Sequence, residues 1–184
     1  MQTSFKITTL FLILSISLLC TQCKQQEKKS ISQASDFEKF TGRWKLGNIQ
    51  VQDTLTKAWN NAGGLNKDRK GFIIYDGLGG MGVHHVSENY EQYILEGKGG
   101  LDSLSQKDLK KMATNFVYFG KYRVNEDDKT IEHHIESHIY PQAWNTIAER
   151  RYEFREDSLI LSPINGNFTA PVRLVWLKLD DRPK

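Results

Sequence analysis

The sequence predicts an all-β fold, an eight-stranded antiparallel up-and-down barrel with one helix inserted before the fourth strand. After residue 36 the chain consists mostly of short strand-like runs separated by turn signals, and eight such runs are enough to close a barrel. Asp76-Gly77 and Gly79-Gly80 permit the positive φ angles of a tight hairpin. With 39% hydrophobic and 26% charged residues, the 184-residue chain has the composition of a globular domain.

The eight predicted strands follow one another along the chain with no internal repeat. They span residues 43–51, 71–75, 80–86, 117–124, 130–140, 146–155, 158–161 and 172–179. Strands that pair in this order leave no free sheet edge once the last one meets the first. A closed barrel of this size has room for one small ligand.

One helix is expected between the third and fourth strands. Ser105 and Asp108 have the spacing of a capping box, which marks a helix start. The apolar residues that follow at helical spacing are Leu109, Met112, Ala113 and Phe116. This stripe is expected to pack the helix on the barrel. The alternative is a mobile lid over the barrel mouth, with hinges at Gly97, Gly99 and Gly100.

The N-terminal segment has the layout of an export signal. Lys6 precedes an apolar run over residues 7–19, which is too short to span a bilayer comfortably, and polar residues follow. The two cysteines, Cys20 and Cys23, stand at the end of this run. They resemble the lipid-attachment site of bacterial lipoproteins, with Cys23 the preferred residue. The alternatives are attachment at Cys20, or simple cleavage that releases a soluble product.

These features divide the chain into a lipoprotein-type signal peptide over residues 1–22, a flexible polar tether over 23–38 and a barrel domain over 39–181. The predicted location is the cell envelope, with membrane attachment through the lipid alone. The alternative is a soluble periplasmic or secreted protein. No cysteine follows Cys23, so the domain is expected to be stabilised by packing without an internal disulfide. The net charge of +3 comes without a Lys/Arg block, so a nucleic-acid partner is not expected.

Several motifs along the predicted strands resemble a known family. Gly42-Arg43-Trp44 opens the first strand and Arg173 lies in the last, as in the lipocalin signature, where the tryptophan caps the barrel floor and an arginine packs across it. Further matches in order and spacing are Gly71-Phe-Ile-Ile-Tyr75, Tyr118-Phe-Gly-Lys-Tyr122, His133-His-Ile-Glu136, Arg150-Arg151 and Leu174-Val-Trp176. Residues 41–179 thus resemble the bacterial lipocalin-like domain family, a calycin-type barrel group. The resemblance implies a barrel with a ligand-sized cavity and no particular reaction.

Strand alternation predicts which side chains face the barrel interior. Within residues 130–140 the inward set is Ile131, His133, Ile135, Ser137 and Ile139. On all strands together, the same rule places five polar residues in an otherwise apolar cup: His85, Tyr122, His133, Arg150 and Tyr152. A few convergent polar groups in an apolar pocket are typical of a small-molecule site, and Arg150 is able to bind a carboxylate bidentately. The alternative is that these groups satisfy one another in a buried polar network.

A metal site is a minor hypothesis. His134, Glu136 and His138 stand at alternate positions and are expected to share one strand face, as two histidines and a carboxylate do in some metal sites. The favoured interpretation is a solvated outer face beside Lys121 and Arg123. No cofactor is therefore expected.

Three functions are compatible with these features. The first is a lipid-anchored protein that binds a small hydrophobic or amphipathic molecule in the barrel. The second is a cofactor-independent isomerase, cyclase or hydratase in which His133 or His85 transfers protons and Arg150 orients the substrate. The third is an interaction scaffold whose interior is filled by its own side chains. The sequence contains neither a Gly-x-Ser-x-Gly elbow nor a phosphate-binding loop.

Overall fold

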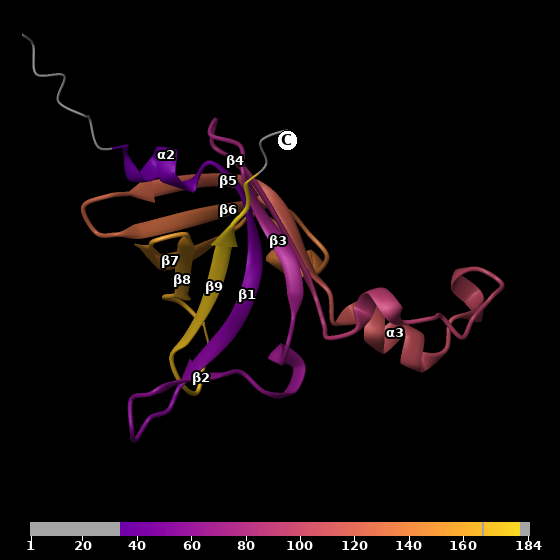
Figure 1. Cartoon of the computed structure of the whole chain (residues 1–184). Coiled ribbons are helices and arrows are strands. Elements are labelled where there is room, and N and C mark those ends of the chain that lie inside the picture. Colours follow the sequence, from indigo (N-terminus) through magenta and orange to yellow (C-terminus); the bar gives the residue numbers. More distant parts are fainter. Residues whose placement is uncertain (1–33, 167, 181–184) are drawn as a thin grey trace, which may run out of the picture. The chain divides into compact units, whose positions relative to one another are not determined.

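The computed structural model describes residues 34–166 and 168–180, and residues from Ser35 onward form one compact unit (Figure 1). The predicted signal peptide over residues 1–22 and the lipid-attachment residue Cys23 lie outside the described residues, as does most of the predicted tether. Among the described residues, no helix is long and apolar enough to cross a membrane.

The described chain forms a single antiparallel sheet that closes on itself. Its strands are β1 (Gly42–Gln52), β2 (Trp59–Asn61), β3 (Lys70–Tyr75), β4 (Gly80–Val86), β5 (Phe116–Asn125), β6 (Thr130–His138), β7 (Thr146–Arg155), β8 (Ser158–Pro163) and β9 (Val172–Lys178). The short strand β2 pairs with the end of β1. The other eight strands pair in chain order, and β9 pairs back with β1. This confirms the predicted eight-stranded up-and-down barrel.

The main helical insertion lies where the sequence predicts it. Helix α3 (Gln106–Ala113) precedes β5, the fourth of the eight barrel strands, and Ser105 and Asp108 form the predicted capping box. The expected packing of an apolar helix face on the barrel is wrong, because Leu109 is 52% exposed and Phe116 belongs to β5. The short 3-10 turns are η1 (Gly64–Asn66), η2 (Tyr90–Gln92), η3 (Leu101–Ser103) and η4 (Pro141–Ala143).

Helix α2 (Asp36–Phe40) lies across one end of the barrel, called here the α2 end (Figure 1). Ser35 and Glu38 form a capping box at its start, and the Phe40 side chain is fully buried. Residues 35–38, which the sequence analysis assigns to the tether, thus lie in this capped helix. Ser35 followed by Glu38 three residues later is a helix-start pattern that the sequence already contained.

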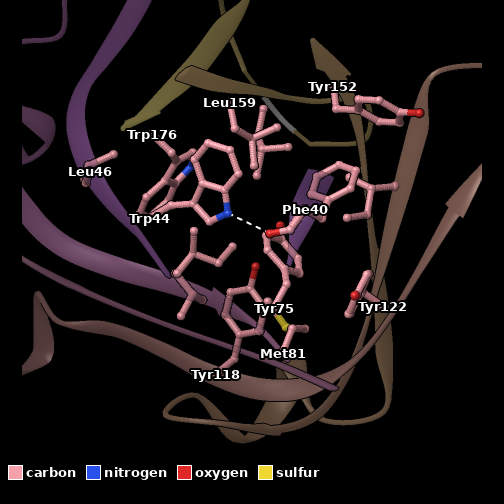
Figure 2. Close-up of a cluster of buried hydrophobic side chains, with 14 of the residues drawn as sticks. Phe40, Trp44, Leu46, Tyr75, Met81, Tyr118, Tyr122, Tyr152, Leu159 and Trp176 are labelled. Carbon is pink, nitrogen blue, oxygen red and sulfur yellow. Dashed lines mark hydrogen bonds between the residues drawn. The ribbon is translucent and has the colours of Figure 1, made fainter. Parts of the chain in front are cut away.

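The tryptophan of Gly-x-Trp lies at the α2 end, as the resemblance implies. Trp44 Nε1 donates a hydrogen bond of 2.8 Å to the Phe40 carbonyl oxygen (Figure 2). The arginine expected across it lies elsewhere, because Arg173 pairs with Gln50 near the other end of β1 and stacks on Trp59. The cation over the Trp44 ring is instead Lys178, with Nζ 4.2 Å from the ring centre.

A β-bulge in β6 reverses the predicted alternation after Ile135. Gly120 pairs with Ile135 and Phe119 with Ser137, which leaves Glu136 as the extra residue. A Cβ atom on Gly120 would stand 2.0 Å from the His134 carbonyl oxygen, so the position opposite the bulge requires glycine.

The bulge corrects the predicted inward set in its second half. Ile131, His133 and Ile135 are buried as predicted. Beyond the bulge, His138 is buried and Ile139 is 42% exposed, the reverse of the prediction. Ser137, also predicted to face inward, pairs with the exposed Phe119.

Candidate functional site

The interior of the barrel is lined mainly by aromatic side chains that reach it from several strands (Figure 2). At the α2 end they surround Phe40, whose ring centroid lies 5.1 Å from that of Tyr75 and 5.0 Å from that of Tyr152. The buried aromatic residues of the core are Phe40, Trp44, Tyr75, Tyr118, Tyr122, Tyr152 and Trp176. Aromatic faces of this kind offer a large apolar contact area with a few fixed polar atoms.

A tyrosine–histidine–tyrosine network lies in the middle of this interior. His133 is fully buried, with Nε2 2.9 Å from the Tyr75 hydroxyl and Nδ1 2.7 Å from the Tyr118 hydroxyl. Burial, together with the positive charge of Arg150, lowers the pKa of His133 well below its usual value. Burial also raises the pKa of both tyrosines. All three side chains are therefore neutral near pH 7.

Arg150 is the positively charged residue that acts on this network. Its Nη1 donates a hydrogen bond of 3.0 Å to the Ala148 carbonyl oxygen, and its positive charge influences the pKa of both His133 and His85. Within the described part of the chain, no carboxylate lies within ion-pair distance of it. The predicted inward orientation of Arg150 is consistent with these interactions.

The barrel end opposite α2 is called here the mouth, where β4 ends at Val86, β5 begins at Phe116 and β6 ends at His138. A cavity of about 230 Å³ lies there. Its lining residues include Arg69, His85, Phe116 and Tyr140. Two of these lining residues contact the interior: His85 is buried, Phe116 packs against the core, and their rings stack at 4.9 Å between centroids.

Arg69, which the sequence analysis missed, fixes His85 and the chain around the mouth. Its Nε donates to His85 Nδ1 at 2.7 Å, and Nη2 donates to the carbonyl oxygens of His85 and Thr114 at 3.0 and 2.7 Å. Burial first, and the Arg69 charge in addition, lower the pKa of His85 to about 3. A lone arginine in a loop has no periodic pattern that would assign it to a site.

The segment between β4 and β5 is held together by Asp108, which is fully buried. Its carboxylate accepts hydrogen bonds from the Tyr93 hydroxyl at 2.9 Å and from the backbone N–H groups of Glu96 and Gly97 at 3.0 and 3.2 Å. These contacts order the stretch that contains Gly97. The proposed hinge role of its glycines stays a prediction.

His138 is a further interior residue that the sequence analysis placed on the wrong face. Its ring stacks on Tyr118 with centroids 5.8 Å apart and meets Phe116 edge-on at 5.2 Å. Its Nδ1 accepts a 2.8 Å hydrogen bond from the Tyr140 backbone N–H. The β6 bulge is the reason that simple alternation did not find it.

Two of the predicted ligand residues belong to the α2 end. Tyr152 donates a 2.7 Å hydrogen bond to Asp36, whose carboxylate also pairs with Lys39 and Lys129 at 2.8 and 2.7 Å. Tyr122 stacks on Phe37 with centroids 5.1 Å apart. The structure thus brings His85, His133 and Arg150 into one interior region and uses Tyr122 and Tyr152 to attach α2.

Burial alone would raise the pKa of Asp36. Hydrogen bonds from Lys129, Lys39 and Tyr152 outweigh this effect and hold the pKa well below its usual range. Asp36 is therefore charged at neutral pH and links α2 to the barrel.

The three residues considered for a metal are not brought together. His134 lies on the outer face and bonds to Glu132 at 2.7 Å, Glu136 pairs with Lys121 at 3.1 Å, and His138 points inward. The predicted shared face is wrong because Glu136 occupies the bulge. Among the described residues, no group of three His, Cys, Asp or Glu side chains is placed to hold a metal ion.

Comparison with known proteins agrees with the architecture. The model of the lipocalin-like domain family matches residues 41–178, which span β1 to β9. Neither the curated proteins nor the solved structures include a significant match. With most of the chain matched and the closed eight-stranded barrel in place, the protein belongs to the lipocalin-like domain family.

Proposed function

We propose that the chain binds a small amphipathic molecule inside the barrel and admits it through the mouth. The supporting observation is the difference between the two barrel ends. Phe40 and α2 close one end, whereas the other has a cavity of about 230 Å³ that reaches His85 and Phe116. A largely pre-formed apolar site with a few polar groups is the usual form of a small-molecule site.

The chemistry of the wall supports a molecule with an apolar body and a polar end. Aromatic rings such as Phe116 and Tyr118 offer apolar faces near the mouth, with centroids 5.6 Å apart. Arg150 and the network around His133 are the polar groups next to them. Such an arrangement favours binding in one orientation, with the polar end directed toward the arginine.

Acid–base catalysis is less well supported by the electrostatics of the two histidines considered for it. A general base works best when its pKa lies near the operating pH. Burial lowers the pKa of His133 well below that range and that of His85 to about 3. In addition, both ring nitrogens of His133 are occupied by tyrosine hydroxyls. These features suit a neutral, fixed binding wall better than a proton-transfer site.

We also propose that the barrel is held at the cell envelope by a lipid on Cys23. The support is the apolar run over residues 7–19 and the cysteine that follows it in a polar context. Cells that express the full chain and are fed a clickable palmitate should label the wild-type protein and Cys20→Ser, whereas Cys23→Ser should lose the label. If Cys23→Ser kept the label and Cys20→Ser lost it, the lipid would be attached to Cys20 instead. An unlabelled wild type would favour a soluble product.

Binding inside the barrel can be tested by filling the interior. Ala148 is partly buried against the core and pairs with His133, whereas its neighbour Ile147 is 56% exposed on the outer face. The full-length chain should bind the neutral fluorescent probe N-phenyl-1-naphthylamine. Ala148→Phe should weaken this binding about tenfold or more, which corresponds to about 1.4 kcal/mol, and Ile147→Phe should leave it unchanged.

A thermal unfolding curve for each variant verifies that the barrel remains folded. Equal probe binding by Ala148→Phe and the wild type would place the probe outside the barrel and contradict the proposal. A wild type that binds no probe, and carries no additional mass in native mass spectrometry, would favour the scaffold interpretation.

A further inference from the structure

We infer that the polar end of the bound molecule is an anion, with a carboxylate the simplest case, held by Arg150 and by neutral hydrogen-bond donors around Phe116. This inference rests on the proposed function, because it names the chemistry of the molecule that the barrel binds. The supporting observation is that several interior hydrogen-bond donors have no acceptor among the described residues.

The first donor without an acceptor is the indole of Trp176. The side chain is 1% exposed, and its Nε1 has no hydrogen-bond partner among the described residues. Its ring lies 6.5 Å from that of His85, between centroids. Because buried N–H groups are nearly always hydrogen-bonded, this donor indicates an acceptor supplied from outside the chain.

Two imidazoles that contact Phe116 are also fixed as donors, and one of them, His85, lies beside Trp176. His85 Nδ1 accepts from Arg69, and His138 Nδ1 accepts from the Tyr140 backbone N–H. Burial lowers the pKa of both residues, so each is neutral and carries its proton on Nε2. Their rings contact Phe116 at 4.9 and 5.2 Å between centroids. Neither Nε2 has a hydrogen-bond acceptor in the described part of the chain.

The network around His133 contains one more hydrogen-bond donor, a tyrosine hydroxyl. A neutral imidazole donates from one nitrogen and accepts at the other, so one tyrosine hydroxyl donates to His133 and the other accepts from it. The hydroxyl that accepts retains its own proton. Since neither Tyr75 nor Tyr118 has another hydrogen-bond partner among the described residues, this proton is available to a ligand.

Among the residues that the structure describes, none places a carboxylate in the interior to match these donors. The buried carboxylates of the described chain are Asp36 and Asp108. Asp36 is bonded to Tyr152, Lys39 and Lys129 at the α2 end, and Asp108 holds the segment before α3. A neutral carbonyl would supply one acceptor atom. A carboxylate supplies two acceptor oxygens and a charge that complements the Arg150 guanidinium.

The test compares two probes of the same shape that differ in charge. Their affinities for the full-length chain at pH 7.5 can be measured by displacement of N-phenyl-1-naphthylamine. The acid, 1-naphthaleneacetate, should bind about tenfold or more tightly than 1-naphthaleneacetamide, as expected for charge-assisted hydrogen bonds. Arg150→Met should abolish this preference while affinity for the amide stays within about twofold.

Arg151→Met is the matched control, because Arg151 is the next residue on β7 and is exposed on the outer face. It should retain the wild-type preference. Arg150→Lys keeps the charge without the planar fork and should retain part of it. Bound N-phenyl-1-naphthylamine reports in each variant that the barrel is folded.

The outcomes separate this inference from the function on which it rests. If acid and amide bind equally while the neutral probe binds, the anion inference is wrong and the proposed binding function stands. Acid preference that persists in Arg150→Met would also overturn it. If neither the neutral probe nor the two naphthalene compounds bind the wild type, the proposed function fails and the inference with it.

Discussion

Lowering the pH from 7 to 4.5 is expected to reduce the free energy of unfolding of the barrel by about 4–5 kcal/mol, mainly through two buried imidazoles. Burial and the nearby Arg150 charge lower the pKa of His133 well below 6.5. Burial and the Arg69 charge lower that of His85 to about 3. Around His133 the facing groups are Tyr75, Tyr118 and Arg150, and none of them is a carboxylate that would stabilise a protonated ring.

The loss of stability at lower pH follows because the unfolded chain binds more protons than the folded barrel. Below pH 6.5 the imidazoles of the unfolded chain take up protons, while those of the folded barrel stay neutral. Stability is thus complete above about pH 6.5 and falls by about 1.4 kcal/mol per pH unit for each imidazole. Burial alone would raise the pKa of Asp36 and Asp108, but hydrogen bonds have the larger effect and lower it below the usual value. The stability that these two carboxylates contribute is therefore lost only in more acidic solution.

Urea unfolding at several pH values between 6.5 and 4.5 measures this slope. His133→Gln should lower stability at neutral pH and reduce the slope by about 1.4 kcal/mol per pH unit, since one buried imidazole is gone. The control is His134→Gln, which removes an imidazole from the outer side of the same strand. If both variants changed the slope equally, the buried ring would not be the source of the pH dependence.

The barrel itself could be predicted because its signals are local and repeated. Alternating apolar residues mark each strand, and glycines mark the turn where β3 meets β4: Gly77 and Gly79 have φ angles of 77° and 104°. The Ser105–Asp108 pair marked the start of α3 because capping is decided within one helical turn. Pairing in chain order brings the strands side by side, and the long-range pairing of β9 with β1 closes the barrel.

The candidate site could be predicted only in part, because several of its features depend on contacts distant in sequence. His85, His133 and Arg150 were found because strand alternation holds up to their positions. His138 was missed because one extra residue at Glu136 moves every later side chain to the other face. Arg69 was missed because its role depends on acceptors at Thr114 and His85, which only the fold brings near.

The second large expected effect concerns Phe40, at the N-terminal boundary of the barrel domain. Phe40→Ala should lower the free energy of unfolding by about 3–5 kcal/mol, because the ring is fully buried and the cavity left behind is bounded by strands that cannot collapse. Four rings pack on it, those of Tyr75, Tyr122, Tyr152 and Phe154, the last with centroids 4.9 Å apart. Leu55→Ala is the control, since Leu55 is 90% exposed, and should change stability by less than about 0.5 kcal/mol.

Urea unfolding followed by tryptophan fluorescence distinguishes the two interpretations of this segment. If residues up to 38 were a tether, Asp36→Asn would leave the stability unchanged, as Leu55→Ala does. If α2 is part of the barrel, Asp36→Asn should also destabilise, because it removes the charge that Lys39 and Lys129 pair with at 2.8 and 2.7 Å. Loss of stability in both variants would mean that the binding cup depends on residues 35–40 for its closed end. A shortened protein that begins at residue 39 would then lack most of α2 and with it the closed end of the barrel.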